Sequence, residues 1–279
     1  MTTKNLTLVV GATGNTGSRV TADLAALGLP VRAASRKGTA LAGTEAVQFD
    51  WYNTETHTAA LKGVKRLYLV PPVGDNDPAA VMLPFLAQAQ EAGVQRAVLL
   101  SASAVEPGGP AVGLVHQALP EIFEEWAVLR PSWFMQNFIE AHPHALSIRE
   151  EGTIWSATDD GRVGFIDAAD IAAVAVRALL DEPSLNTDLI LTGPETLSYD
   201  DVASIVAAAI GHPVIHRRLS YQQMRDRIAA SLPLEFASLL AGMDRSIAEG
   251  SEDRITDTVQ RITGRAPRSL RALLQHRAS

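Results

Sequence analysis

The stretch Leu6–Gly17, which reads LTLVVGATGNTG, constrains the fold more than any other part of this chain. Residues 6–10 form a short apolar run, which is typical of a strand buried on both faces of a sheet. Residues 18–27 have apolar side chains at helical spacing and predict a helix. A strand, a glycine turn and a helix in this order form the arrangement that binds a dinucleotide.

The three glycines of the turn have different predicted tasks. Gly11 permits a tight turn, Gly14 lets a pyrophosphate approach the backbone, and Gly17 lets the helix pack closely. The first N–H groups of the helix have no partners within it and attract phosphate. The spacing is G-x-x-G-x-x-G rather than G-x-G-x-x-G, and an ordinary strand–turn–helix is the alternative. The predicted cofactor contacts in this turn are Gly11, Thr13, Gly14, Asn15, Thr16 and Gly17.

Strands alternate with helices over the first half of the chain. The predicted strands are 6–10, 30–35, 47–50, 66–70, 96–100 and 126–130, and the predicted helices are 18–27, 57–61, 78–92 and 113–124. Pro120 is expected to interrupt the last helix or to begin a new turn. This alternation predicts an α/β fold with a Rossmann-type, doubly wound parallel sheet. Ligands of such sheets bind beyond the carboxyl ends of the strands.

The pattern changes after Pro131, and the second half is expected to be mostly helical. We predict a helix over 133–148, broken near Pro143, and further helices over 168–180 and 199–210, the last capped by Ser198. We expect two parts. A cofactor-binding domain covers 1–150, and the segment 163–192 returns to it. A smaller substrate-binding lobe covers 193–279 and includes 151–162.

The residues at the predicted strand ends indicate which cofactor is bound. The second strand ends in Ser35-Arg36-Lys37, without the acidic residue that would accept the ribose hydroxyls of NAD(H). Two cations suit a 2′-phosphate, so we expect NADP(H), with a solvated basic turn as the alternative. Asp50, beside Trp51, is placed to meet the adenine amino group or to cap the next helix. The later strand ends add Val70, Pro71, Pro72, Ser101 and Ala102 as expected cofactor contacts.

Composition excludes several classes of function. The chain of 279 residues contains no cysteine, which excludes disulfides, thiolate catalysis and cysteine-ligated zinc; we predict no metal site. A net charge of −7 without a basic cluster argues against nucleic acid as a partner. No apolar run reaches the ~18 residues that would span a membrane. The first strand follows so soon that we expect no signal peptide and a cytoplasmic location.

Four stretches carry a resemblance to a known family. They are GATGNTG, Gly109–Leu119 (GPAVGLVHQAL), Leu129–Phe138 (LRPSWFMQNF) and Thr263–Leu270 (TGRAPRSL). Together they resemble the NmrA-like group of atypical short-chain dehydrogenases/reductases, and most of all its agroclavine/festuclavine dehydrogenase branch. The resemblance implies an NADPH-binding, NAD(P)-dependent oxidoreductase that reduces an iminium, enone or quinone-like acceptor, as a monomer or homodimer.

The chain departs from the wider superfamily at the usual proton donor. Most members use Tyr-x-x-x-Lys after the fifth strand, and no tyrosine lies within 113–124 here. Reduction of a carbonyl to an alcohol needs an acid and is disfavoured, whereas an iminium needs only hydride. His116 takes the place of the lysine and is our candidate catalytic residue. It is expected to act as an acid, to contact the nicotinamide ribose, or to be a helix-surface histidine.

The substrate is expected to lie against residues after the fifth and sixth strands. We predict contacts from Ser103, Trp133, Phe134, Met135, Asn137 and Phe138, although at least two of the apolar ones are expected in the core. Arg130, Asp167 and Asp170 are expected to be structural. The predicted function is NADPH-dependent reduction of a small flat acceptor. The alternative is a redox-sensing regulator that binds the dinucleotide without turnover.

Overall fold

The computed structural model describes residues 5–278 and divides them into two compact units. Unit 1 comprises the described residues up to Pro131, together with Ala168–Ile190 and Arg261–Gly264. Unit 2 comprises Ser132–Asp167, Leu191–Gln260 and the residues from Arg265 onward. Each unit has its own buried core, and each is described separately below.

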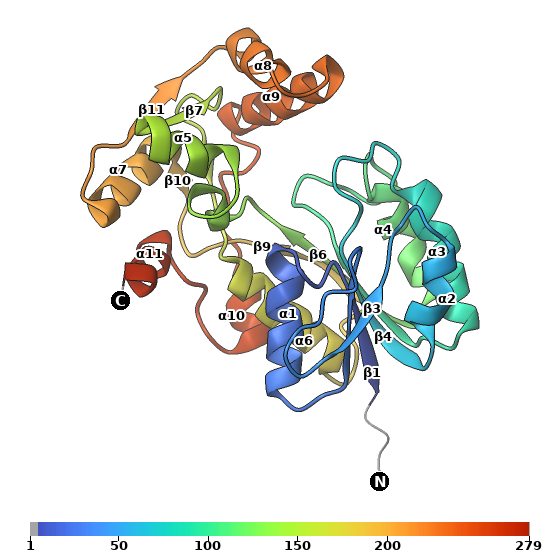
Figure 1. The fold of residues 1–279 in the computed structure, drawn as a ribbon. Coiled ribbons are helices and arrows are strands. Elements are labelled where there is room, and N and C mark those ends of the chain that lie inside the picture. Colours follow the sequence, from blue (N-terminus) through green and yellow to red (C-terminus); the bar gives the residue numbers. More distant parts are fainter. Residues whose placement is uncertain (1–4, 279) are drawn as a thin grey trace. The chain divides into compact units, whose positions relative to one another are not determined.

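Unit 1 is built on a seven-stranded sheet in the order β3-β2-β1-β4-β5-β6-β9 (Figure 1). The pairs from β3 through β6 are parallel. The strand order reverses between β1 and β4. The carboxyl ends of these two strands therefore mark the topological switch point of a Rossmann-type fold. The strands are β1 Leu6–Val10, β2 Val31–Ser35, β3 Glu45–Gln48, β4 Val64–Leu69, β5 Arg96–Leu100, β6 Glu125–Pro131 and β9 Thr187–Leu191.

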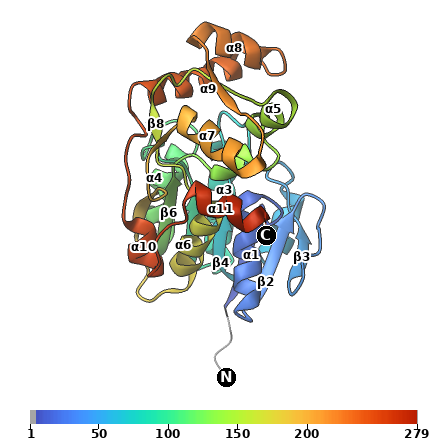
Figure 2. The ribbon, with the colours of Figure 1, turned by 90° about the vertical axis from the view of Figure 1, so that its left-hand side faces the viewer.

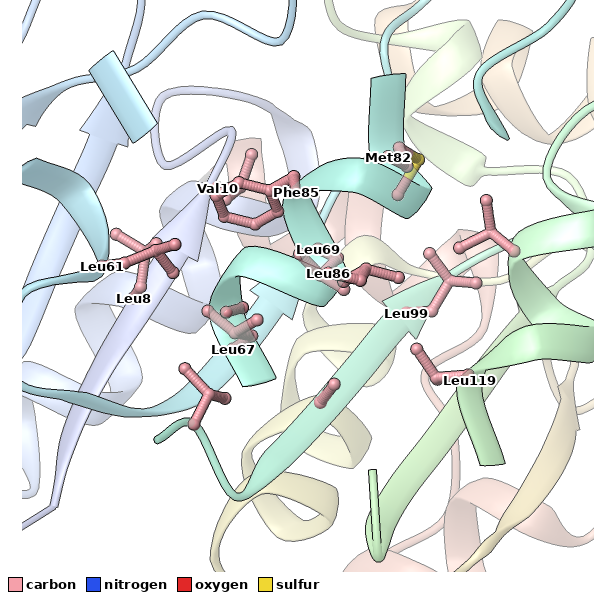
Figure 3. Close-up of a cluster of buried hydrophobic side chains, with 14 of the residues drawn as sticks. Leu8, Val10, Leu61, Leu67, Leu69, Met82, Phe85, Leu86, Leu99 and Leu119 are labelled. Atoms are coloured by element: carbon pink, nitrogen blue, oxygen red, sulfur yellow. The ribbon is translucent and has the colours of Figure 1, made fainter. Parts of the chain in front are cut away.

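Helices cover both faces of this sheet. α1 (Asn15–Ala26) and α6 (Ala168–Leu180) lie together on one face, and α2 (Glu55–Leu61), α3 (Ala79–Glu91) and α4 (Gly113–Ile122) lie on the other (Figure 1). Apolar side chains of β1, β4 and β5 pack against α3 in the larger core cluster (Figure 3). The labelled side chains there include Leu8, Val10, Leu67, Leu69, Met82, Phe85 and Leu86.

Two buried strand arginines hold the ends of helices in unit 1. Arg32 of β2 donates to the carbonyls of Ala60 at 2.8 Å and Lys62 at 2.6 Å, at the end of α2. Arg96 of β5 is fully buried and donates to Leu179 O at 3.0 Å, at the end of α6. The last carbonyls of a helix have no partner within it, so these guanidinium groups satisfy them and complement the helix dipole.

Unit 2 is made of short elements around a core that contains Phe138, Phe165 and Tyr199. Its two small sheets pair β7 with β11 in parallel and β8 with β10 in antiparallel. Helices α8 and α9 lie side by side (Figure 2). The elements are η1 Met135–Phe138, α5 Pro143–Glu151, β7 Thr153–Ser156, β8 Arg162–Val163, β10 Leu197–Ser198, α7 Tyr199–Ile210, β11 Ile215–Arg218, α8 Tyr221–Ala229, α9 Leu234–Ala248 and α11 Leu270–Ala278. The helix α10 (Thr258–Thr263) begins in the part of the chain assigned to unit 2 and ends in the part assigned to unit 1.

Several local predictions need correction. Residues 133–148 do not form one helix: a short 3-10 turn occupies Met135–Phe138, and α5 begins only at Pro143. Proline disfavours helical geometry in the residue before it, and His142 is extended, with φ of −145°. Pro120 does not interrupt α4, which continues to Ile122.

Two other sequence expectations concern the second half of the chain. Ser198 caps α7 as predicted, in a capping box with Asp201. The chain enters unit 2 at Ser132, earlier than the expected boundary at residue 150, because Met135, Phe138 and Ile148 belong to the unit 2 core. Within residues 5–278, no helix combines the length and apolarity needed to cross a membrane.

Candidate functional site

The glycine turn joins β1 to α1 at the switch point of the sheet. Gly11 has φ of +74°, which is the left-handed conformation that favours glycine. A Cβ on Gly17 would lie 2.2 Å from the carbonyl oxygen of Gly11, so α1 begins pressed against the turn itself. Gly14 is the N-cap residue and has no side chain to cover the first N–H groups of the helix. Gly14 N itself donates to Gly11 O at 2.9 Å, so the groups available to an anion are the N–H groups of the helix turn that follows it.

A groove of about 430 Å³ opens where the first four strands of the chain end. It is the arrangement expected for a ligand at the switch point of an open α/β sheet. A larger concavity of about 510 Å³ beside α2 and α3 contains neither the glycine turn nor a strand end. The residues that line the groove are Val10, Gly11, Thr13, Gly14, Ala34, Ser35, Arg36, Phe49, Asp50, Trp51, Tyr52, Val70, Pro71, Pro72 and Val73.

Arg36 lines this groove from the loop after β2. The loop is held by Ser35, whose hydroxyl accepts a hydrogen bond from Thr39 N at 2.9 Å and whose carbonyl accepts from Gly38 N at 3.1 Å. Arg36 itself is exposed, so its guanidinium is free to meet a phosphate in the groove. Lys37 is also exposed but is not part of the groove lining.

Within the groove lining, a hydrogen bond joins the segment after β3 to the end of β4. The indole N–H of Trp51 donates to Val70 O at 3.1 Å, and the indole is largely buried. Asp50 Oδ1 accepts from Tyr52 N at 3.0 Å, which forms a tight turn. Asp50 therefore faces the groove from a turn, and it does not cap α2, whose N-cap residue is Thr54.

Five residues that line the groove were not predicted from the sequence. They are Val10, Ala34, Phe49, Tyr52 and Val73. Each directly adjoins a predicted residue, so extending every strand-end segment by one position would have found them.

Other predicted contacts lie outside the groove lining. Thr16 is buried, and its hydroxyl accepts a hydrogen bond of 2.9 Å from Tyr68, so its side chain points into unit 1 rather than toward a ligand. Asn15 Oδ1 accepts from Arg19 at 2.7 Å. Gly17 is packed against Gly11. Ser101 and Ala102 are half-buried after β5, and the buried Ser101 hydroxyl has no hydrogen-bond partner within residues 5–278.

His116 lies in α4 and is only 4% exposed, so its interpretation as a helix-surface histidine is wrong. Its Nδ1 is buried without a hydrogen-bond partner in the described part of the chain. Burial lowers the pKa of this imidazole, and nearby Asp188 partly opposes the effect. His116 is therefore neutral at pH 7.

Arg130 fixes the segment after β5, as its predicted structural role requires. Its guanidinium donates to Ser103 O at 3.0 Å, to Asp188 at 2.7 Å and to the carboxylate of Glu106. The backbone of Ser103 is thus held in place from β6.

The predicted substrate residues after β6 belong to unit 2. Met135 and Phe138 are 1% and 3% exposed and form part of the unit 2 core, so they are not surface contacts. Trp133, Phe134 and Asn137 are half-buried.

Asp167 has the structural role predicted for it. It accepts a hydrogen bond from Gln136 at 2.8 Å and pairs with Arg268 at 2.9 Å. Arg268 is thereby tied, through Asp167, to Gln136 of η1 within unit 2.

The groove fits a dinucleotide phosphate better than an apolar ligand alone. Gly14 lines the groove at the N-cap of α1, so no side chain there stands between the groove and the helix N-terminus. Arg36 supplies a cation from the same groove. Among residues 5–278, no three histidine, aspartate or glutamate side chains are placed to hold a metal ion.

Comparisons with known proteins agree with this fold. The model of the NmrA-like family matches residues 3–264. The chain is 49% identical to a Bacillus subtilis protein named uncharacterized oxidoreductase YesF, over 97% of this chain and 94% of that one. It is 38% identical to agroclavine dehydrogenase of Claviceps fusiformis, over 94% and 93% of the two chains. The structure of the NADPH-dependent quinone oxidoreductase QOR2 of Escherichia coli, complexed with NADPH, has the same fold, with a TM-score of 0.82, 22% identity and coverage of 98% and 100%. The chain belongs to the NmrA-like family.

Proposed function

We propose that this protein is an NADPH-dependent reductase of a small, flat organic acceptor, of iminium, enone or quinone-like type. The observation that carries the proposal is the groove at the switch point, which combines the glycine turn with Arg36. Relatives named as an oxidoreductase and as a clavine dehydrogenase support the reaction class.

Different residues in and around the groove bind different parts of the cofactor. The first N–H groups of α1 bind the pyrophosphate, and Arg36 pairs with the 2′-phosphate. Asp50 and Trp51 hold the adenine end, and the unpartnered hydroxyl of Ser101 is available to the nicotinamide half. NADPH, when bound, supplies a hydride to the acceptor.

The residues of the chain also limit which acceptor can be reduced. No tyrosine lies in α4, and His116 is held neutral by burial. Protonation of an alkoxide by the protein is therefore disfavoured, and an acceptor that is already electrophilic is favoured. An iminium carbon meets this condition without a protein acid.

Arg36→Ala tests the cofactor assignment. Wild type should bind NADPH more tightly than NADH, and the variant should lose roughly tenfold or more of its NADPH affinity, because a charge-assisted contact is worth about 1.5–3 kcal/mol. Lys62→Ala removes an equal charge outside the groove and is the matched control. Equal wild-type affinities for the two cofactors, or an unchanged variant, would contradict NADPH selectivity.

A screen of quinones, enones and cyclic imines with NADPH tests the reaction itself. Oxidation of NADPH that depends on one of these acceptors is expected and is followed by the loss of absorbance of the reduced nicotinamide. Tight binding of NADPH with no turnover on any of the three classes would favour the regulator instead.

A further inference from the structure

Tyr68 lies in β4, opposite Val9 of β1, and its side chain is fully buried. Its hydroxyl donates to Thr16 Oγ1 at 2.9 Å, and Thr16 is the second residue of α1. Burial raises the pKa of Tyr68 well above its ordinary value, so the phenol remains a donor at any working pH. The bond joins a central strand to the first turn of the helix that begins at the glycine turn.

The first turn of α1 has no side-chain cap that would hold it in place. Its N-cap residue is Gly14, which has no side chain that could cap the helix. The close approach of Gly17 to Gly11 O leaves no room for the helix to move toward the turn. The hydrogen bond from Tyr68 restrains the same turn of the helix from the sheet below it.

The position of this first turn matters because the N-cap residue before it, Gly14, lines the groove, and the N–H groups at a helix N-terminus attract an anion placed there. Hydrogen bonds weaken steeply when donor and acceptor are misaligned, so a small shift of the turn weakens several contacts to one phosphate. Neither Thr16 nor Tyr68 lines the groove. Any effect of this pair on a ligand must therefore act through the backbone of the turn.

We propose that Tyr68 is a positioning residue for the phosphate subsite: through Thr16 it holds the first turn of α1 at the height where its N–H groups bind the cofactor pyrophosphate. This inference rests on the proposed function, since it requires a dinucleotide phosphate at the start of α1. It assigns the hydroxyl of Thr16 to the positioning bond and leaves the phosphate to the backbone.

Two adenosine fragments separate positioning from a general loss of stability. Adenosine 2′,5′-bisphosphate contains the 5′-phosphate that meets the turn, and adenosine 2′-monophosphate lacks it. In Tyr68→Phe, calorimetric titration should show roughly a threefold to tenfold loss of affinity for the bisphosphate, as expected for one hydrogen bond. The affinity for the monophosphate should not change.

Thr16→Val removes the other partner with little change in volume and provides a second variant. It should show the same selective loss, and the double variant should lose no more than either single one. Tyr199→Phe removes a buried phenol hydroxyl from the unit 2 core and is the matched control, with both fragment affinities unchanged.

Three outcomes would overturn the inference. They are unchanged bisphosphate affinity in both variants, an equal loss for both fragments, and additive losses in the double variant. If wild type binds neither fragment nor NADPH, the proposed function fails instead, so the two failures are distinguishable.

Discussion

The phenol of Tyr52 donates a hydrogen bond of 2.6 Å to Oδ2 of Asp75, which joins the loop after β3 to the loop after β4. Asp75 is held in turn, because its Oδ1 accepts from Asp77 N at 2.9 Å. The bond lowers the pKa of the Asp75 carboxyl and raises the pKa of the Tyr52 phenol. At pH 7 it therefore links a neutral donor to a charged acceptor beside the groove at the switch point.

Breaking this bond should shorten the residence of NADPH in the groove. Tyr52→Phe and Asp75→Asn should each raise the dissociation rate by about twofold to fivefold, a modest effect because Tyr52 is exposed to water and Asp75 is only half-buried. Stopped-flow displacement of NADPH measures this rate. Asp77→Asn changes the same charge in the same loop and should leave the rate unchanged. The prediction fails if Asp77→Asn has the same effect as Asp75→Asn, or if neither partner variant releases NADPH faster.

The glycines of the turn should differ in what their replacement costs. Gly14 has φ of −85°, which an alanine adopts, and its Cβ would meet Gly11 O at 3.2 Å. Gly14→Ala should therefore fold but lose roughly tenfold or more in NADPH affinity. Gly17→Ala would place a Cβ 2.2 Å from the same oxygen and should destabilise the protein by about 1–3 kcal/mol.

Thermal unfolding and NADPH titration separate these two effects. Gly242→Ala is the control, because a Cβ at that position in α9 meets nothing within 4 Å. A Gly14→Ala protein that binds NADPH normally would show that the phosphate lies elsewhere. A Gly17→Ala protein as stable as wild type would show that α1 shifts freely.

The sequence predicts the sheet of unit 1 because its signals are local. The apolar run at residues 6–10 and the glycines after it specify a buried strand, a turn and a helix within one short segment. The groove follows from the same information, since parallel strands end at one edge. Ser35, Arg36 and Asp50 were found in this way, and they line the groove.

The sequence does not reveal contacts that depend on the tertiary structure. Thr16 follows directly after Asn15 in the turn, yet its hydroxyl faces Tyr68, fifty-two residues along the chain. Met135 and Phe138 have the same apolar character in a core as in a binding pocket, and only the packing against Phe165 and Tyr199 decides between them. Short elements such as η1 carry too little periodicity to be recognised.

Asp244 should make unit 2 less stable above about pH 6 than at pH 4. It lies buried in α9, where Oδ2 accepts from Ala157 N at 2.8 Å, and burial raises its pKa from 3.8 to about 6. A carboxyl whose pKa is raised by folding contributes stability below its unfolded pKa, and this contribution is lost as the pH rises through about 6. The ionised form costs at most about 3 kcal/mol at pH 8.

Asp244→Asn keeps an acceptor for Ala157 N and removes the charge. Its melting temperature should exceed that of wild type at pH 8, and the difference should shrink toward pH 4, where Asp244 is protonated. Thermal unfolding across this range measures the effect, with the exposed Asp253→Asn as control. A difference that grows toward acid pH would contradict the raised pKa.

The last prediction concerns His116, whose two remaining roles differ in their pH dependence. The imidazole is 4% exposed, and burial lowers its pKa below the ordinary value of 6.5. It therefore stays neutral from pH 7 upward and lacks the proton that an acid must donate there. We expect His116 to contact the nicotinamide ribose, so His116→Ala should weaken NADPH binding by roughly threefold to tenfold, the loss expected for one hydrogen bond. The pH profile of turnover should keep its shape, and Gln117→Ala, an exposed neighbour in α4, should match wild type.

An acid role would instead lower turnover about a hundredfold and move the alkaline limb of the profile. If neither affinity nor turnover changes, His116 only fills the core under α4, and the reaction depends on how the chain holds the two rings in contact.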